Sequence, residues 1–416
     1  MQENSKKFEE RLKRVNDAIA LKEPDRVPCI PQAQTYPYLR AGFTMAEIMY
    51  DTEKAKDSIR KYLREYEPDM GLGYGAVFAG QGPIMEKAGI KWLQWAGQPG
   101  SNIDKNSIHQ YIEKAYLEED EYPELLSDLS GWITRRRLPR CFSAFEPLAN
   151  MDFRGALGYG YLPSMLQFIN PAITETFKTM SEIGMMAGQI YGDTAAFDQE
   201  IQEMGFPVEF AATTTTAFDQ LSDTLRGTMG TMVDLFEQPE NVLSAVEMFF
   251  PGSIFSALAQ AKHSIGKWVF IPLHKGMDGF MSPKQYNEFY WPTLKRLINA
   301  LIDNGCIPYV YTEGKYDSRL ETLTDIPKGK VIYHFEDVDM AEAKRIIGPH
   351  ACITGGFNGR LLETGTKEQV VDGVKRLLDI CAPGGGYIFD VNDTMDNCKP
   401  ENVEAMFDTV KTYGKY

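Results

Sequence analysis

Residues that can bind a metal ion or move a proton recur at one kind of position in this sequence. Each of them follows a short run of β-branched and aromatic residues typical of a buried strand; they are His274, Glu313, His334, Asn358 and Asp390. If these strands are parallel, their carboxyl ends share one edge or one mouth, where side chains from distant parts of the chain converge. Imidazole and carboxylate groups placed in this way are candidates for acid–base catalysis or metal binding.

A zinc site is one chemistry that this set would allow, because zinc accepts thiolate, imidazole and carboxylate ligands from separate strand ends. The candidate metal ligands are Glu313, Asp390 and Cys398, the last of which lies in the loop after the final strand. The spacing alone is equally typical of hydrogen-bonded polar residues around a barrel mouth, so both interpretations stay open.

Glycine and aromatic residues interleave in three stretches of the N-terminal half, near Tyr74, Trp92 and Tyr159. Loops of this composition suit a flat, apolar ligand. They are also typical of flexible loops anchored in a core. We predict that the three aromatic side chains line a substrate pocket.

The elements that would position these residues alternate between strands and helices. Five strand-like runs end near His274, Gly314, Asp337, Phe357 and Val391, with amphipathic stretches between them. Three further runs lie near Val27, Met70 and Pro207. Eight strands in this order predict an α/β fold of the (β/α)8 TIM-barrel type.

The competing fold is a doubly wound sheet, which the absence of a GxGxxG segment after a strand disfavours. Between the second and third predicted strands, about 130 residues (roughly 77–205) form an inserted helical region. A single domain spanning residues 1–416 is therefore expected.

Charge and composition exclude several classes of protein. The chain has 416 residues and a net charge of −15, which disfavours binding to nucleic acid or to an anionic membrane. Its N-terminus is charged and lacks the apolar region of a signal peptide. No run approaches ~18 apolar residues, so no transmembrane helix is expected. The six scattered cysteines fit a cytoplasmic protein.

Two long segments, Phe218–Val242 and Phe335–Val370, resemble the uroporphyrinogen decarboxylase superfamily. The short motifs APGGGYIF and KPENVEAM follow in the family's order and spacing. The resemblance runs from about Phe8 to the C-terminus and implies a (β/α)8 barrel. It also implies one of two chemistries, a metal-free decarboxylation or a zinc-dependent methyl transfer that involves a corrinoid.

The matching motifs favour the methyltransferase branch. The decarboxylases carry RQAGRY, whose two arginines bind substrate carboxylates, whereas this chain reads PQAQTY from Pro31 to Tyr36. The decarboxylases also have an essential aspartate in the second βα loop, and none occurs between Gly71 and Gly100. A decarboxylase-like lyase is thus the alternative. In this segment Gln34 and Tyr36 are candidates for substrate binding.

Methyltransferases that act on coenzyme M are a second alternative. They carry HxC on the fifth strand, where this chain has Tyr311 and Glu313 instead. The chain looks more like the first methyltransferase of corrinoid-dependent O-demethylation. That enzyme moves a methyl group from a methoxylated donor, here expected to be aromatic, to the Co(I) corrinoid of a partner protein, and a zinc ion would act as Lewis acid.

The resemblance assigns roles that the residue pattern alone leaves open. The expected catalytic residues are Tyr311, Glu313 and His334. The expected substrate-binding residues are Gln34, Tyr36, Tyr74, Trp92, Tyr159, His274 and Asn358. O-, N- and S-methyl donors all fit the superfamily, and the oligomeric state is open and compatible with a homodimer.

Metal analysis tests the expected zinc site. We expect about one zinc ion per purified chain and a loss of methyl transfer in Glu313→Ala, since that change removes a ligand. Circular dichroism should show that the variant keeps its fold. A metal-free preparation that retains full activity would contradict the assignment.

Overall fold

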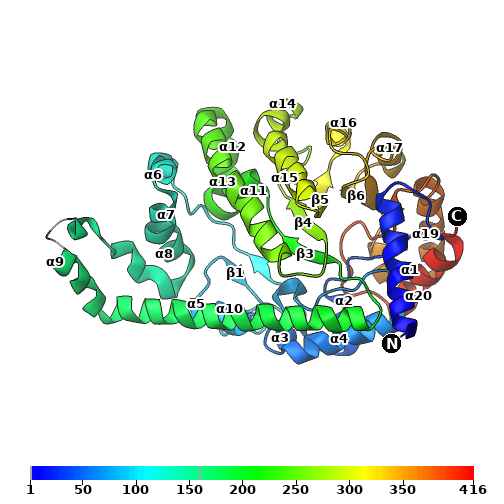
Figure 1. Ribbon diagram of the computed structural model, residues 1–416, viewed down its shortest axis with the longest axis horizontal. Helices are drawn as coiled ribbons and strands as arrows, with labels where there is room; N and C mark the ends of the chain where they lie inside the picture. Colours follow the sequence, from blue (N-terminus) through cyan, green and yellow to red (C-terminus); the bar gives the residue numbers. More distant parts are fainter. Residues whose placement is uncertain (1, 158, 160) are drawn as a thin grey trace.

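A parallel sheet forms the centre of the computed structural model, which describes residues 2–157, 159 and 161–416. The order of its six strands is the order of the chain, β3-β4-β5-β6-β7-β8. The strands are β3 (Phe210–Thr213), β4 (Trp268–Leu273), β5 (Ile307–Lys315), β6 (Ile332–Asp337), β7 (Cys352–Gly355) and β8 (Tyr387–Ile388). Parallel neighbours in chain order require a crossover after each strand, and helices provide it (Figure 1).

Two short extended segments close this sheet into a barrel. Cys29 forms a parallel bridge with Phe389 just after β8, and Gly71 forms one with Val208 just before β3. The two segments are joined to each other, since the Asp69 amide donates to the Cys29 carbonyl oxygen at 3.0 Å. The strands predicted near Val27 and Met70 therefore lie where the eight-stranded barrel requires them, and the (β/α)8 prediction is confirmed.

The helices around the barrel follow the predicted amphipathic stretches. The principal ones are α1 (Gln2–Ile19), α4 (Thr52–Tyr66), α11 (Ala217–Leu221), α12 (Gly227–Glu237), α13 (Pro239–Ala261), α15 (Trp291–Asp303), α17 (Met340–Ile346), α19 (Lys367–Cys381) and α20 (Pro400–Tyr413). Helix α19 opens with a capping box between Thr366 and Gln369.

The amphipathic stretch Ser282–Gly305 is helical but interrupted. A π-helical turn, Tyr286–Tyr290, separates the short α14 (Pro283–Gln285) from α15. Pro292, in the first turn of α15, has no amide hydrogen to continue the α-helical ladder, which explains a break at this point.

Helix α13 has the length and apolar composition of a membrane-spanning helix, although the sequence predicts none. Val242, Val246 and Phe249 of this helix are buried in the main core. Its neighbours there are α11, α15 and β3. Packing on the outside of the barrel therefore accounts for part of this apolar composition, since 39% of the apolar window is buried.

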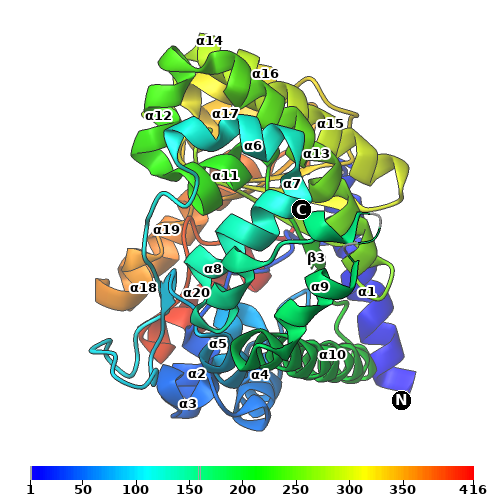
Figure 2. The same ribbon diagram turned by 90° about the vertical axis from the view of Figure 1, so that its left-hand side faces the viewer.

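The predicted insertion lies between Gly71 and β3. It contains α5 (Gly82–Ala88), the antiparallel pair β1 (Leu93–Gln94) and β2 (Gln110–Tyr111), α6 (Tyr122–Ser127), α7 (Leu129–Trp132), α8 (Leu138–Cys141), α9 (Tyr161–Met165) and α10 (Pro171–Glu203). The C-terminal part of α10 packs beside the barrel, whereas its N-terminal part and α9 project from the body (Figures 1 and 2). We call this projection, within residues 152–192, the arm.

Asp69 ties the closing segments to helix α1. Its buried carboxylate accepts hydrogen bonds from the Arg14 guanidinium at 2.6 Å and from Arg26 at 2.7 and 2.9 Å. It also accepts one from the Cys29 amide at 2.7 Å. A buried carboxylate needs such partners, because desolvation would otherwise make its charge very costly.

Removing this carboxylate should destabilise the barrel. We expect Asp69→Ala to lower the free energy of unfolding by about 3–5 kcal/mol, because two partly buried arginines lose their counter-ion. Asp25→Ala is the matched control, since Asp25 is exposed and pairs with the same Arg14; its effect should stay within about 1 kcal/mol. Urea denaturation of the two variants gives the comparison, and equal effects would contradict a special role for Asp69.

Candidate active site at the carboxyl ends of the strands

The carboxyl ends of β4, β5, β6 and β8 bring titratable side chains together at one end of the barrel, which we call the mouth. His274 directly follows β4, Glu313 lies near the end of β5, and Glu336 lies near the end of β6. Asp393 lies in the loop after β8. Inward and outward side chains alternate along each strand, so residues one position away face the surrounding helices instead.

His274 lies between two carboxylates. Its Nδ1 atom is 2.5 Å from Oδ2 of Asp223, and its Nε2 atom is 3.4 Å from Oε1 of Glu313. Burial lowers the pKa of the ring, but the hydrogen bonds to Asp223 and Glu313 outweigh it and raise the pKa to about 11. The imidazole is therefore charged at neutral pH, with a proton on each nitrogen.

Asp219 holds the backbone at His274 in place. Its buried carboxylate accepts hydrogen bonds from the amides of His274 at 3.2 Å and Lys275 at 3.1 Å, and from the Tyr290 hydroxyl at 2.6 Å. Burial, together with the nearby Asp223, raises the pKa of Asp219 to about 6. Asp219 therefore positions His274 while Asp223 holds its charge.

The sequence interpretation missed this supporting set. Asp219 and Asp223 lie four residues apart on α11 and on the π-helical turn that follows it (Ser222–Arg226), so they share one helix face. The Lys275 ammonium lies 3.3 Å from Asp223 and adds a second cation. The sequence did contain a signal for this set, because Asp219 and Asp223 are two acidic residues four positions apart just after a predicted strand.

Two further carboxylates, Glu336 and Asp393, lie with Glu313 at the mouth. Glu313 is half-exposed, and the Glu336 side chain accepts a hydrogen bond from the Gly314 amide. Burial, then the charges of Asp393 and Glu313, raise the pKa of Glu336. Burial, Asp396 and Glu313 likewise raise the pKa of Asp393. The mouth is thus strongly negative around one imidazolium and one ammonium.

Tyr311 and His334, both expected to be catalytic, form part of the wall below the mouth. Their rings stack with centroids 4.1 Å apart and planes 11° apart. The Tyr311 hydroxyl donates to the Asp393 carbonyl oxygen at 3.3 Å, and burial raises its pKa. His334 is fully buried with Nε2 2.9 Å from the Val391 carbonyl oxygen, and burial lowers its pKa to about 4. The His334 ring is thus neutral, and its Nε2 donates a hydrogen bond to the Val391 carbonyl oxygen.

The structure does not gather the three expected zinc ligands. Asp390 lies deep in the barrel, where its carboxylate accepts from the amides of Gln32 and Val391 at 2.7 Å and from the Tyr309 hydroxyl at 3.1 Å. Burial raises its pKa to about 8. Within the described residues, no group of three or more His, Cys, Asp or Glu side chains is arranged to hold a metal ion. The neighbour of Glu313 is His274, which could supply one further ligand only by giving up its proton.

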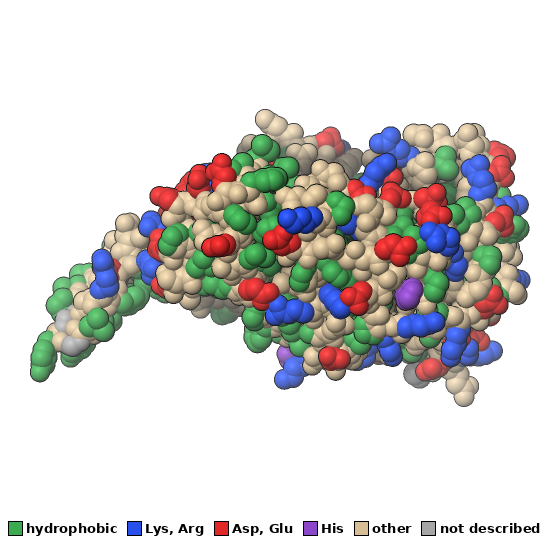
Figure 3. Space-filling view, turned by 90° about the horizontal axis from the view of Figure 1, so that it is seen from above, with side chains coloured by type: hydrophobic (Ala, Val, Ile, Leu, Met, Phe, Trp, Pro, Cys, Tyr) green, Lys and Arg blue, Asp and Glu red, His purple; other side chains and the backbone are tan. Residues whose placement is uncertain are grey.

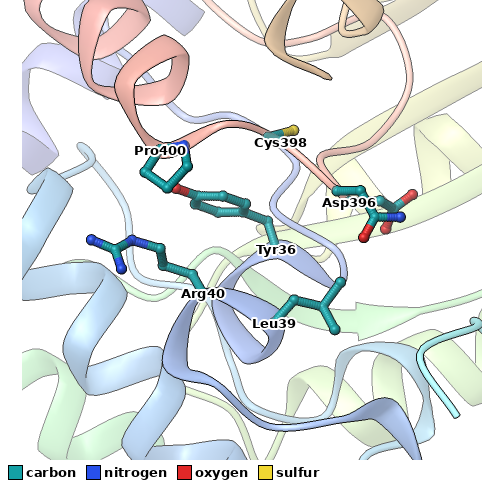
Figure 4. A pocket seen from close by; sticks show the side chains of 7 residues that line it. Tyr36, Leu39, Arg40, Asp396, Cys398 and Pro400 are labelled. Atoms are coloured by element: carbon teal, nitrogen blue, oxygen red, sulfur yellow. The ribbon is translucent and has the colours of Figure 1, made fainter. Parts of the chain in front are cut away.

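Cys398 instead lines a groove of about 300 Å³ between α2 (Tyr36–Ala41) and the loop after β8. The groove is lined by Tyr36, Leu39, Arg40, Asp396, Asn397, Cys398 and Pro400, with Arg40 and Asp396 on opposite sides of Tyr36 (Figure 4). Burial raises the pKa of Cys398 to about 12, so its thiol is protonated. Gln34 lies half-buried in the same segment as Tyr36.

The β1–β2 hairpin brings an aromatic wall to the mouth. Burial, Glu313 and Asp223 all raise the pKa of Tyr111, which places this phenol near both carboxylates. Trp92 stacks on Tyr111, with centroids 5.9 Å apart and planes 14° apart. Trp92 therefore lies beside the mouth through its contact with Tyr111, and its role in substrate binding stays a prediction. Tyr111 is a neighbour that the sequence interpretation missed.

The other predicted substrate residues lie elsewhere. Tyr74 is buried, and its hydroxyl donates to Asp193 of α10 at 3.0 Å, so it anchors the insertion. Tyr159 is fully exposed on the arm. Asn358 is exposed after β7, and its side-chain oxygen accepts from the Arg360 amide at 3.2 Å. The structure brings none of these three to the His274 pair.

The family match covers the chain from the end of the insertion, including α10, to α20. The family model described as uroporphyrinogen decarboxylase (URO-D) matches residues 169–413. The uroporphyrinogen decarboxylase of Geobacter metallireducens is 29% identical over 133 residues, which are 32% of this chain and 38% of the relative. That of Syntrophotalea carbinolica is 24% identical over 177 residues, 42% of this chain and 50% of the relative. The chain thus spans half or less of these relatives.

Among solved structures, a methyltransferase from Methanosarcina mazei has a similar fold. The TM-score is 0.63 at 13% sequence identity, and the match covers 96% of this chain and 98% of the other. At this identity the likeness shows a shared fold.

The charge on His274 gives a pH prediction. Its pKa of about 11 exceeds the ordinary 6.5, so its contribution to stability is complete below about pH 6.5 and is lost as the pH rises through about 11. We expect the ring to stay protonated at about pH 8 in the native protein. In Asp223→Asn it should be largely neutral there, because a major counter-charge is gone. Histidine NMR titration measures both, and a native ring that titrates near pH 6.5 would contradict the assignment.

Proposed function

This chain belongs to the uroporphyrinogen decarboxylase family, and we propose that it is a methyltransferase. In this proposal it moves a methyl group from a small methylated donor to the Co(I) corrinoid of a partner protein. The likeness to the Methanosarcina mazei methyltransferase supports a barrel suited to this reaction. The observation that carries the proposal is the position of the His274 ring, held at the mouth between the carboxylates of Asp223 and Glu313.

A methyl group bound to oxygen leaves only if the oxygen can accept the electrons of the broken bond. Cobalt in the Co(I) state supplies the electron pair of the new bond to carbon. The C–O pair stays on the oxygen, which takes the Nε2 proton of His274 and departs as an alcohol or phenol. His274 then becomes neutral and keeps its Nδ1 hydrogen bond to Asp223, so charge and protons balance.

The protein's own residues supply orientation as well as the proton. Asp219 fixes the backbone of His274 through two amide hydrogen bonds, and Asp223 fixes the ring. Holding the donor and the acceptor in line contributes much of the rate in such a displacement. The stacked pair Trp92 and Tyr111 offers a flat apolar wall, which supports a methoxylated aromatic as the donor.

Decarboxylation is the second candidate, because both curated relatives are uroporphyrinogen decarboxylases. A porphyrinogen with many carboxylates would meet Glu313, Glu336 and Asp393 at this mouth. The segment that carries substrate-binding arginines in the decarboxylases has Pro31 and Thr35 here. Repulsion by these three carboxylates, in a chain that lacks the two substrate-binding arginines, disfavours this substrate.

Zinc stays a prediction of the sequence. The donor set around Glu313 does not fit a resident zinc ion, since Asp390 is held by three hydrogen-bond donors inside the barrel and Cys398 lines the groove beside Tyr36. No step of the proposed reaction is therefore assigned to a metal bound by these residues.

A methyl-transfer assay tests the function. A panel of methoxylated aromatics is mixed with the protein and reduced free cobalamin, and the loss of Co(I) absorbance is followed. We expect His274→Gln to lower kcat by about 10²–10⁴-fold, the range for losing a general acid. His263→Gln, at an exposed residue beyond α13, is the matched control and should be unchanged.

The choice of donor distinguishes proton donation from a structural effect. The loss in His274→Gln should shrink as the leaving phenol becomes more acidic, because such a phenol needs less protonation. An equal loss for all donors would contradict the role of His274. Failure of every methylated donor, O-, N- or S-linked, would overturn the methyltransferase assignment.

A further inference from the structure

Two neighbouring segments at the mouth carry the His274 pair and are bonded to each other. The His274 loop, residues 274–281, follows β4, and the Arg319 segment, residues 315–319, begins at the end of β5, just after Glu313. Nε2 of His274 and Oε1 of Glu313 are 3.4 Å apart. This separation exceeds the usual N–H···O hydrogen-bond distance of about 2.9–3.0 Å. The two backbones, rather than a tight bond between the side chains, therefore have to set it.

Arg319 joins the two segments from inside the protein. Many Lys and Arg side chains lie on the surface beside Asp and Glu (Figure 3), whereas Arg319 is only 1% exposed. Its Nε atom donates to the Gly276 carbonyl oxygen at 3.2 Å, and its Nη2 atom donates to the Met281 carbonyl oxygen. One planar guanidinium thus holds the His274 loop at two points, which a lysine ammonium on a flexible stem does not do equally well.

Further contacts hold the guanidinium and the loop in place. The guanidinium carbon of Arg319 lies 4.6 Å from the Tyr286 ring centroid, and its Nε atom is 3.4 Å from Oδ1 of Asp278. The Asp278 carboxylate accepts hydrogen bonds from the Ser318 amide at 3.1 Å and the Ser318 hydroxyl at 2.7 Å. The Asp278 amide donates to the Lys315 carbonyl oxygen at 2.8 Å. The His274 loop is therefore bonded to the Arg319 segment through backbone and side chains alike.

We propose that Arg319 is a positioning residue for proton donation by His274. The proposal rests on the proposed function, in which the Nε2 proton of His274 passes to the departing oxygen. Asp219 binds only the first two amides of the His274 loop, those of His274 and Lys275. Arg319 holds the rest of the loop against the segment that follows Glu313. Nε2 then faces Glu313 without a tight bond to it, so the ring is oriented and its proton is available to the leaving group.

Kinetics of a variant test this role. We expect Arg319→Lys to lower kcat about 10²-fold for a methoxylated aromatic with reduced free cobalamin, because a small displacement of the proton donor has a cost of this size. KM should be unchanged, since a side chain that is 1% exposed does not contact the donor. The loss should shrink for more acidic leaving phenols, which need less protonation.

A double variant separates positioning from general damage to the protein. If Arg319 acts through His274, Arg319→Lys should cost nothing further in a His274→Gln background, because no imidazole is left to position. Two losses that multiply would overturn the proposal. Ser318→Ala removes the hydroxyl bond to Asp278 at an exposed position that folding tolerates. It should lower kcat less than Arg319→Lys does, again with KM unchanged.

Arg11→Lys is the matched control. Arg11 is also buried, its guanidinium carbon lies 3.9 Å from the Phe206 ring centroid, and it donates to the Gly205 carbonyl oxygen at 2.6 Å. Gly205 precedes β3, so these contacts lie at the other end of the barrel from the mouth. The melting temperature should fall by a similar amount in Arg11→Lys and Arg319→Lys, but kcat should fall only in the second. An equal loss of kcat in both would contradict a specific role for Arg319.

Hydrogen exchange provides a measurement that needs no turnover. Amides of the His274 loop should exchange faster in Arg319→Lys than in the native chain, and at the native rate in Arg11→Lys. Unchanged exchange in Arg319→Lys would overturn the proposal even if methyl transfer is observed. Faster exchange in a chain whose native form transfers no methyl group would overturn the proposed function but support Arg319 as the residue that holds the loop.

Discussion

Closure of the parallel sheet is the constraint on which the rest of the molecule depends. Six strands pair along their length, but the remaining two positions of the barrel are short segments around Cys29 and Gly71, held by single bridges and a few amide hydrogen bonds. The buried Asp69 strengthens this weak part by binding Arg14, Arg26 and the Cys29 amide. Without closure, the groove between α2 and the loop after β8 would not form, and the strand ends would not face a common mouth.

The closed barrel brings charged side chains of both signs together at its mouth. Several carboxylates lie within a few residues of the strand ends, yet they do not simply repel one another, because His274 and Lys275 bring positive charge among them. Asp219 and Asp223 have different functions although one helix face carries both. Asp219 accepts hydrogen bonds from two amides and a hydroxyl, whereas Asp223 accepts one from the imidazole.

The inserted region gives the common barrel its individual features. The family match begins at residue 169, so most of the insertion lies outside it. Its hairpin places Trp92 and Tyr111 beside the mouth, where His109 packs between Phe78 and Tyr111. Its arm points away from the barrel (Figures 1 and 2). In our proposed function, the hairpin contacts the substrate.

The sequence by itself determined the barrel, because strand and helix periodicity is a local property that each segment carries in its own residues. It also located the mouth, since the ends of parallel strands must lie together. Only the tertiary structure decided which polar side chains meet. Asp390 and Glu313 both end strands, but Asp390 lies deeper, where backbone amides and Tyr309 hold it, while Glu313 reaches the rim and meets His274. Depth along a strand and the register between neighbouring strands set these contacts, and both are fixed by closure of the whole barrel rather than by any one segment.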